Sequence, residues 1–366
     1  MKPSISEITD RLKYISKQNL YYREDFPDAA SRWEAWWNFQ SDRHLLVAAL
    51  PNEKNIRRDK CFDLLENPEE WLALRKRQLE NTYFLDQTIP GIRVDLGPVA
   101  TGAFLGAPLH FAGEEQTSWQ NPVWDRLADA EPPVLEQDNK WYRLTRKLCD
   151  LTASDARGSY VVVLPDLGGA ADILANLRGA EGLLLDLYDN PEKVLKLQEA
   201  LVDRWESVFF DLYGRITEKG TGVVCWHQAW SEKPYTVPSC DFNYMVGPEH
   251  FKELILPSLR DQAKRAGRCS YHLDGPGASV HAESLAGAEE IDVIQYTPGA
   301  GTPSAMAKIE MYKMIQERGK PVIVMSPAEE VPQLVKELDP RGTVIFPEGL
   351  KSRSEADELL EMVKSK

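Results

Sequence analysis

Short apolar runs alternate with longer helix-like stretches from residue 158 to the end of the chain. The apolar runs cover residues 160–164, 222–226, 268–272, 292–296, 321–325 and 343–346. The helix-like stretches cover residues 191–212, 248–266, 304–318, 328–338 and 354–364. This alternation predicts repeated βα units, a parallel sheet and right-handed crossovers. Such units indicate an α/β fold of the closed (β/α)₈ TIM-barrel type, with an open doubly wound sheet as the alternative.

Residues 1–150 follow a different pattern, rich in aromatic and charged residues at irregular spacing. Apolar positions three and four apart predict amphipathic helices at residues 5–14 and 68–83, joined by long loops. We therefore predict one domain over residues 1–366, with an extended helical, aromatic-rich region at 1–150 and the clearest βα repeats at 151–366. The aromatic region could form a lid or a homodimer surface, and the pattern favours neither.

Composition narrows the range of partners. The 366-residue chain is 43% hydrophobic and 27% charged, which is enough to bury a substantial core. Its formal net charge of -14 argues against a nucleic-acid partner, and against a strongly anionic substrate unless a local basic pocket overrides it. No run of roughly 18 apolar residues appears and residues 1–10 do not resemble a signal peptide, so we expect a cytoplasmic protein with no membrane partner. Five scattered cysteines predict neither a disulfide framework nor a zinc ribbon.

The ends of the predicted strands carry side chains able to bind metal or move protons. His272 and Asp274 end one run, and strand alternation sends both to the same side, with Leu273 opposite. That geometry suits a shared metal or a coupled acid–base pair, because imidazole and carboxylate oxygens together fit zinc, manganese or iron(II). A simple turn is the alternative, since the Asp-Gly and Pro-Gly pairs at 274–277 mark turns for local reasons.

Other candidates end the remaining runs or lie just beyond them. They are Asp166, Trp226, His227, Gln295, Tyr296 and Glu348. Asp241 lies between a strand-like run and a helix start, where it could cap the helix or bind a ligand. Arg178 could recognise a carboxylate or anchor a loop.

Four blocks of sequence, with a weaker match at residues 36–51, carry a resemblance to a known family. The blocks are residues 172–179, 240–245, 271–277 and 295–301. On these the chain resembles the uroporphyrinogen decarboxylase superfamily, and in particular its bacterial branch grouped with corrinoid-dependent methyltransferases. The His-Leu-Asp-Gly-Pro-Gly-Ala and Pro-Gly-Ala-Gly blocks are specific to that branch. The resemblance implies a (β/α)₈ barrel with its active cleft at the carboxyl ends of the strands.

The resemblance also bears on the reaction. Uroporphyrinogen decarboxylases hold their acidic substrate with an arginine-rich amino-terminal segment, and no such block is found here, so porphyrinogen decarboxylation is disfavoured. The methyltransferases hold zinc with a His-x-Cys pair and a distal cysteine. Here His272 matches, Asp274 replaces the cysteine, and Glu348 lies near the distal position. Hard carboxylates in place of thiolates raise the Lewis acidity of the metal and permit metals other than zinc.

The resemblance implies methyl transfer on a small organic substrate, with a corrinoid entering only through a partner protein. The predicted metal ligands are His272, Asp274 and Glu348, with zinc as the first candidate and manganese or iron as others. The predicted catalytic residues are Asp241, His227 and Tyr296, and the predicted substrate-binding residues are Gln295, Asp166, Arg178 and Trp226. Two alternatives stay open: a metal-independent lyase or decarboxylase, and a non-catalytic partner of a corrinoid protein.

Overall fold

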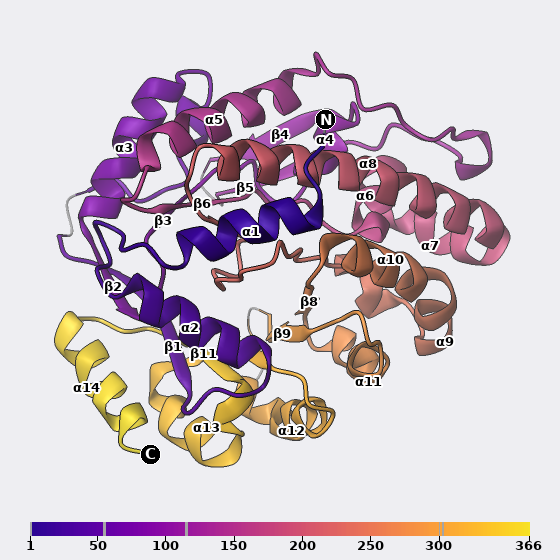
Figure 1. Ribbon diagram of the computed structural model, residues 1–366. Helices are drawn as coiled ribbons and strands as arrows, with labels where there is room; N and C mark the ends of the chain where they lie inside the picture. Colours follow the sequence, from indigo (N-terminus) through magenta and orange to yellow (C-terminus); the bar gives the residue numbers. More distant parts are fainter. Residues whose placement is uncertain (1, 54–55, 114–115, 300, 302–303) are drawn as a thin grey trace.

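Strands lie in the middle of the protein with helices around them (Figure 1). The computed structural model describes residues 2–53, 56–113, 116–299, 301 and 304–366. The larger sheet has the strand order β2-β1-β11-β10-β9-β8. Its parallel strands are β1 (Leu45–Pro51), β8 (Ser270–Asp274), β9 (Val293–Thr297), β10 (Val322–Pro327) and β11 (Thr343–Glu348), and β2 (Thr82–Asp86) pairs antiparallel with β1.

A second parallel sheet continues the same arrangement with shorter strands. It has the order β3 (Gly91–Arg93), β6 (Val161–Val163), β7 (Val223–Val224). The segment 236–239 adds to the far edge of the larger sheet, because isolated parallel bridges join Thr236 to Cys269 and Ser239 to His272. The strands β6, β7, β9, β10 and β11 are largely buried and rich in valine and isoleucine, as expected where helices cover a parallel sheet.

Side chains connect the two sheets where the backbone ladders stop. The Thr88 hydroxyl accepts the Ala48 N–H (2.8 Å) and donates to the Ala48 carbonyl (2.9 Å), which ties β1 to the segment before β3. At the other edge the Tyr235 hydroxyl accepts the Cys225 N–H (2.9 Å). The predicted parallel α/β architecture is thus confirmed and is consistent with a TIM-like fold. Full closure of a barrel is not confirmed, because no backbone ladder among the described residues joins the two sheets.

Helices follow most strands, as the pattern predicted. They include α5 (Lys140–Ala156), α6 (Ala170–Arg178), α7 (Ala180–Asp189), α8 (Pro191–Glu218), α10 (Leu256–Ala266), α11 (Ala282–Ala286), α12 (Ile309–Glu317), α13 (Val331–Glu337) and α14 (Arg353–Lys364). Helix α8 continues past the predicted end at residue 212. Gly214 lowers helix propensity there, but Pro3 packs where its side chain would be, and the helix stops only before Gly220, which has a φ of +76°.

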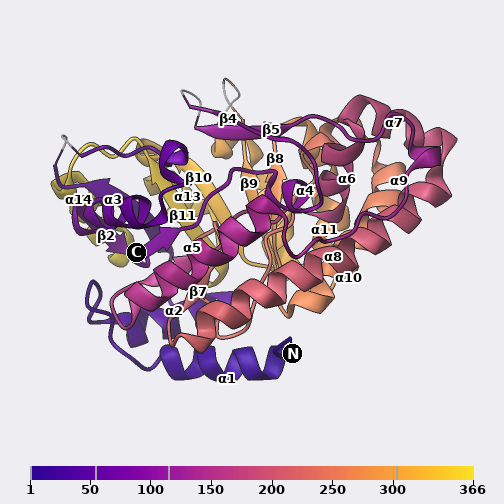
Figure 2. The same ribbon diagram turned by 90° about the horizontal axis from the view of Figure 1, so that it is seen from above.

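The amino-terminal third is more regular than predicted. Helices α1 (Ile5–Ile15) and α3 (Pro68–Glu80) confirm the two amphipathic stretches, and α2 (Phe26–Trp37) and α4 (Ala100–Phe104) are added. The expectation of only helices and loops was wrong, because β1, β2, β3 and the hairpin β4 (Leu109–Ala112)–β5 (Thr117–Gln120) lie in this region. Figure 2 shows α1 and α2 at one end of the molecule and the hairpin at the opposite end.

The tryptophans of α2 belong to the core. Trp33 and Trp36 are fully buried, the Trp33 indole donates to the Gln87 carbonyl (3.1 Å), and the Trp37 indole donates to the Trp230 carbonyl (2.7 Å). The aromatic side chains therefore attach the amino-terminal helices to the segment after β7.

In the described part of the chain, no helix is both long and apolar enough to cross a membrane.

Candidate functional site

Asp241, His272 and Asp274 come together at the carboxyl end of β8. His272 and Asp274 are two residues apart on this strand and face the same side, as predicted from strand alternation. Asp241 begins a 3₁₀ helix (Asp241–Met245) directly after the segment that pairs with β8. One ligand atom from each of the three residues lies within 4.8 Å of the others. Asp241 is the first residue of this helix, whose N-cap position is held by Cys240, so the ligand interpretation of Asp241 fits better than the capping one.

A chain of hydrogen bonds orients the His272 ring. Its Nδ1 contacts the Gln295 Oε1, and the Gln295 Nε2 donates to the Thr297 hydroxyl (2.8 Å). Because the amide nitrogen is directed to Thr297, its oxygen faces His272 and accepts from a protonated Nδ1. This arrangement leaves the Nε2 lone pair of His272 available for a metal or a proton.

Asp172 holds Asp241 in place. Its carboxylate accepts hydrogen bonds from the Ser239 hydroxyl and from the Asp241 N–H (2.7 Å). The segment can approach this closely because Gly169 lacks a side chain: a Cβ there would lie 2.2 Å from the Ser239 carbonyl oxygen. Gly169 thus permits a close backbone contact. Burial raises the pKa of both the Asp172 and the Asp241 carboxyl. The negative charge of Asp241 raises the pKa of Asp172 further.

Two further groups near this cluster can hold or accept a proton. Burial raises the pKa of Asp166 to about 6, although its carboxylate accepts the Gly168 N–H (2.9 Å). Burial lowers the pKa of His227 well below its usual value, and the neighbouring His272 lowers it further. The His227 Nδ1 pairs with the Ser270 hydroxyl (2.8 Å), and its Nε2 is buried without a hydrogen bond of good geometry. His227 is therefore neutral at pH 7.

Three predicted site residues lie elsewhere. Glu348 is exposed at the end of β11, separated from β8 by β10 and β9, and is not part of the cluster. Tyr296 is buried on the opposite face of β9 from Gln295, with its ring 6.2 Å from that of Tyr312 on α12. The Arg178 guanidinium donates to Asp186 on α7 (2.7 Å), which gives it a structural role. Sequence spacing could not reveal the places of Glu348 and Arg178, which depend on strand order and helix packing, whereas the period of two along β9 already sets Tyr296 opposite Gln295.

One cavity borders the cluster, and a second lies behind Trp226, which packs against His272. One, of about 390 Å³, is lined by Asp172, Asp241 and apolar residues such as Phe242 and Met245. The other, of about 300 Å³, is lined by Trp226, whose ring centroid lies 4.8 Å from that of His272. Trp226 therefore has the predicted place beside a pocket. The lining of this second cavity includes Arg93, which sequence analysis missed because its strand lies in the region expected to form loops.

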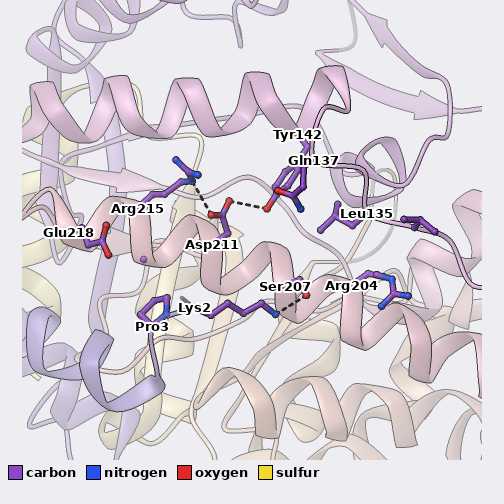
Figure 3. Close-up of a pocket in the computed structure, with 12 residues that line it drawn as sticks. Lys2, Pro3, Leu135, Gln137, Tyr142, Arg204, Ser207, Asp211, Arg215 and Glu218 are labelled. Atoms are coloured by element: carbon purple, nitrogen blue, oxygen red, sulfur yellow. Dashed lines mark hydrogen bonds and ion pairs between the residues drawn. The ribbon is translucent and has the colours of Figure 1, made fainter.

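A larger cavity, of about 610 Å³, lies away from the strand ends (Figure 3). It is bounded by the amino-terminal segment, α5 and α8, and its polar groups satisfy one another. Lys2 donates to the Ser207 hydroxyl (2.7 Å), and Asp211 accepts from Tyr142 (2.9 Å) and Arg215 (3.0 Å). Because these polar groups already hydrogen-bond within the protein, and the Arg204 Nε donates to the Pro133 carbonyl (3.0 Å), we do not assign the cavity to the reaction. The Pro-Gly-Ala-Gly block cannot be assessed in full, since Ala300 lies outside the described residues.

Comparison with known proteins defines the fold. No protein-family model and no curated protein sequence matches the chain. Among solved structures, a methyltransferase from Methanosarcina mazei is similar, with a TM-score of 0.59 and 12% identity over 92% of this chain and 98% of that one. Macrophomate synthase aligns with a TM-score of only 0.24 and 10% identity over 55% of this chain and 74% of that one, which carries no argument. The protein thus has the fold of the Methanosarcina mazei methyltransferase.

Proposed function

We propose that this protein is an enzyme that transfers a methyl group to or from a small organic substrate at a divalent metal bound by Asp241, His272 and Asp274. The observation that carries the proposal is the approach of their ligand atoms to within 4.8 Å. The methyltransferase fold supports the choice of reaction. This ligand set differs from the predicted one, because Asp241 takes the place of Glu348.

The donor set fits a metal. Ligand atoms at about 2.0–2.2 Å from an ion lie about 3–3.5 Å apart, so modest side-chain rotations would close the cluster around one. One imidazole and two carboxylates suit zinc, manganese or iron(II), and three protein ligands leave positions open for a substrate. The Gln295 contact fixes the orientation of the His272 ring, as an outer hydrogen bond does in metal sites. When bound, the ion supplies Lewis acidity toward a substrate oxygen or thiol.

The protein's own groups complete the proposed chemistry. The neutral His227 can only accept a proton, whereas the pKa of about 6 lets Asp166 exist in both forms near neutral pH. Group transfer needs a donor and an acceptor, and the cavity at the cluster and the one behind Trp226 have no lining residue in common. We assign one reactant to each. A corrinoid held by a partner protein is the methyl carrier that the family resemblance implies.

Metal analysis tests this proposal. Purified protein and chelator-treated protein reloaded with zinc, manganese or iron(II) are analysed for bound metal. We expect about one equivalent in the wild type, loss in His272→Ala and Asp241→Asn, and retention in Glu348→Gln. Loss in Glu348→Gln with retention in Asp241→Asn would instead support the ligand set predicted from sequence. A wild type that binds no metal would refute the proposal and favour a metal-independent lyase.

A further inference from the structure

The cavity beside Trp226 has a positively charged wall. Three arginines, Arg58, Arg75 and Arg93, line this space of about 300 Å³, and none of the described residues around it is an aspartate or a glutamate. The chain as a whole has a formal net charge of -14. A wall with three guanidinium groups and no acid therefore reverses the sign of the protein's overall field locally.

Two of these arginines lack a carboxylate partner within the described ranges. Arg58 donates to the Asn81 carbonyl and to the Thr82 hydroxyl (3.1 Å), and Arg75 donates to the Gln78 side-chain oxygen (2.7 Å). Neither forms a salt bridge there. The Arg75 Nε is buried with no hydrogen-bond partner. Since a guanidinium stays charged at all ordinary pH values, Arg75 keeps a donor without a hydrogen bond and a charge that the more distant Asp95 carboxylate offsets only in part.

The third arginine shares its counter-ion. The Arg93 Nε lies 3.5 Å from the Asp95 carboxylate, but the same carboxylate lies 3.6 Å from the Lys60 amine and accepts the Gly97 N–H (2.7 Å). The Arg93 Nε has no hydrogen bond of good geometry. The buried Asp95 thus faces three cations, Arg93, Lys60 and the more distant Arg75, so the cavity wall keeps an excess of positive charge.

Most of the remaining lining is apolar, beside the polar side chains of Gln78, Thr82, Thr88 and Gln228. The apolar walls include Leu79, Phe84, Ile89, Ile92 and Val163, together with the Trp226 ring. Charged donors on one side and apolar side chains on the other are the lining expected for a small amphipathic ligand. Gln228, also in the lining, has a φ of +58°, a strained conformation of the kind that persists at binding sites.

We propose that this cavity binds a small organic carboxylate, with its carboxylate against Arg75 and Arg93 and its apolar body against Trp226. The guanidinium fork matches the two oxygens of a carboxylate. Trp226 packs against His272, so the bound molecule lies one indole ring from the Asp241–His272–Asp274 cluster. Its role as a reactant rests on the proposed function, whereas its binding does not.

Calorimetric titration of the full-length, metal-free protein tests this assignment. Benzoate serves as the probe, and benzamide, which has a similar shape but no charge, serves as the matched ligand control. We expect benzoate to bind and benzamide not to. Arg75→Met should weaken benzoate binding about tenfold or more, through loss of charge-assisted hydrogen bonds. Arg77→Met, an exposed position on the same helix, should bind benzoate like the wild type.

A second variant shows whether weaker benzoate binding could result from misfolding of Arg75→Met alone. Arg58 is exposed, so Arg58→Met should fold normally and also weaken benzoate binding. Benzamide binding equal to that of benzoate, unchanged affinity in both variants, or no benzoate binding at concentrations on the order of 10 mM would each overturn the proposal. Metal analysis of the same proteins separates the two proposals: Arg75→Met should keep the metal, and His272→Ala should keep benzoate binding.

Discussion

Asp166 should make the stability of this protein fall as the pH rises from about 4 to 6. The side chain is 8% exposed, and burial raises its pKa from 3.8 to about 6. The folded state therefore holds a proton that the unfolded state has lost in this interval, and the free energy of unfolding decreases with pH. A shift of about two units corresponds to about 3 kcal/mol, most of it lost between pH 4 and 7.

The substitution Asp166→Asn isolates this effect. Asparagine keeps an oxygen that can accept the Gly168 N–H, but it does not titrate. Urea unfolding is followed by tryptophan fluorescence and circular dichroism from pH 4 to 7, with a chelator present so that metal binding does not contribute. We expect the variant to gain about 2–3 kcal/mol relative to the wild type across this range. The exposed Asp189→Asn is the control and should show no such trend.

Parallel stability curves for the wild type and Asp166→Asn would refute the reasoning. They would mean that the carboxyl titrates at a similar pH in the folded and unfolded states. An advantage of the variant that shrinks as the pH rises would refute it more strongly, because it would require a lowered pKa.

Other residues give tests of the site and its support. Gln295→Ala should lower metal affinity about 10–100-fold in a metal titration, because His272 loses its orienting partner. The control Tyr296→Phe, on the other face of the strand, should bind metal like the wild type. Arg178→Met should lower the free energy of urea unfolding by about 3 kcal/mol and leave metal affinity unchanged, because it leaves the buried Asp186 of α7 without its cation. An unfolding curve like that of the wild type would contradict the structural role. Gly169→Ala should cost about 1–3 kcal/mol in the same assay, since the added methyl meets the carbonyl facing it; an unchanged midpoint would show that the segment moves freely.

Local pattern was sufficient for the repeating elements and for one pair of site residues. The pattern after residue 158 predicted β6 to β11 and the helices α8, α10, α12, α13 and α14, because strands and helices have different periods. It did not predict α6, α7 or α11. The same period of two placed His272 and Asp274 on one side of β8. It also separates Gln295 from Tyr296, which were both predicted as site residues and which the structure places on opposite faces of β9. The general location of the site at the strand ends follows from the parallel fold.

Tertiary structure decided which residues meet. Strand order separates Glu348 from His272, and the bridge between 236–239 and β8 brings Asp241 to the cluster instead. Arg58, Arg75 and Arg93 come from a loop, a helix and a short strand, and no spacing along the chain marks them as one wall. Charge and periodicity are read residue by residue from the sequence, whereas these neighbours depend on long-range packing. The sequence by itself thus determined the elements and the edge where chemistry is expected, and the fold determined the ligand set and the sign of charge in the adjacent cavity.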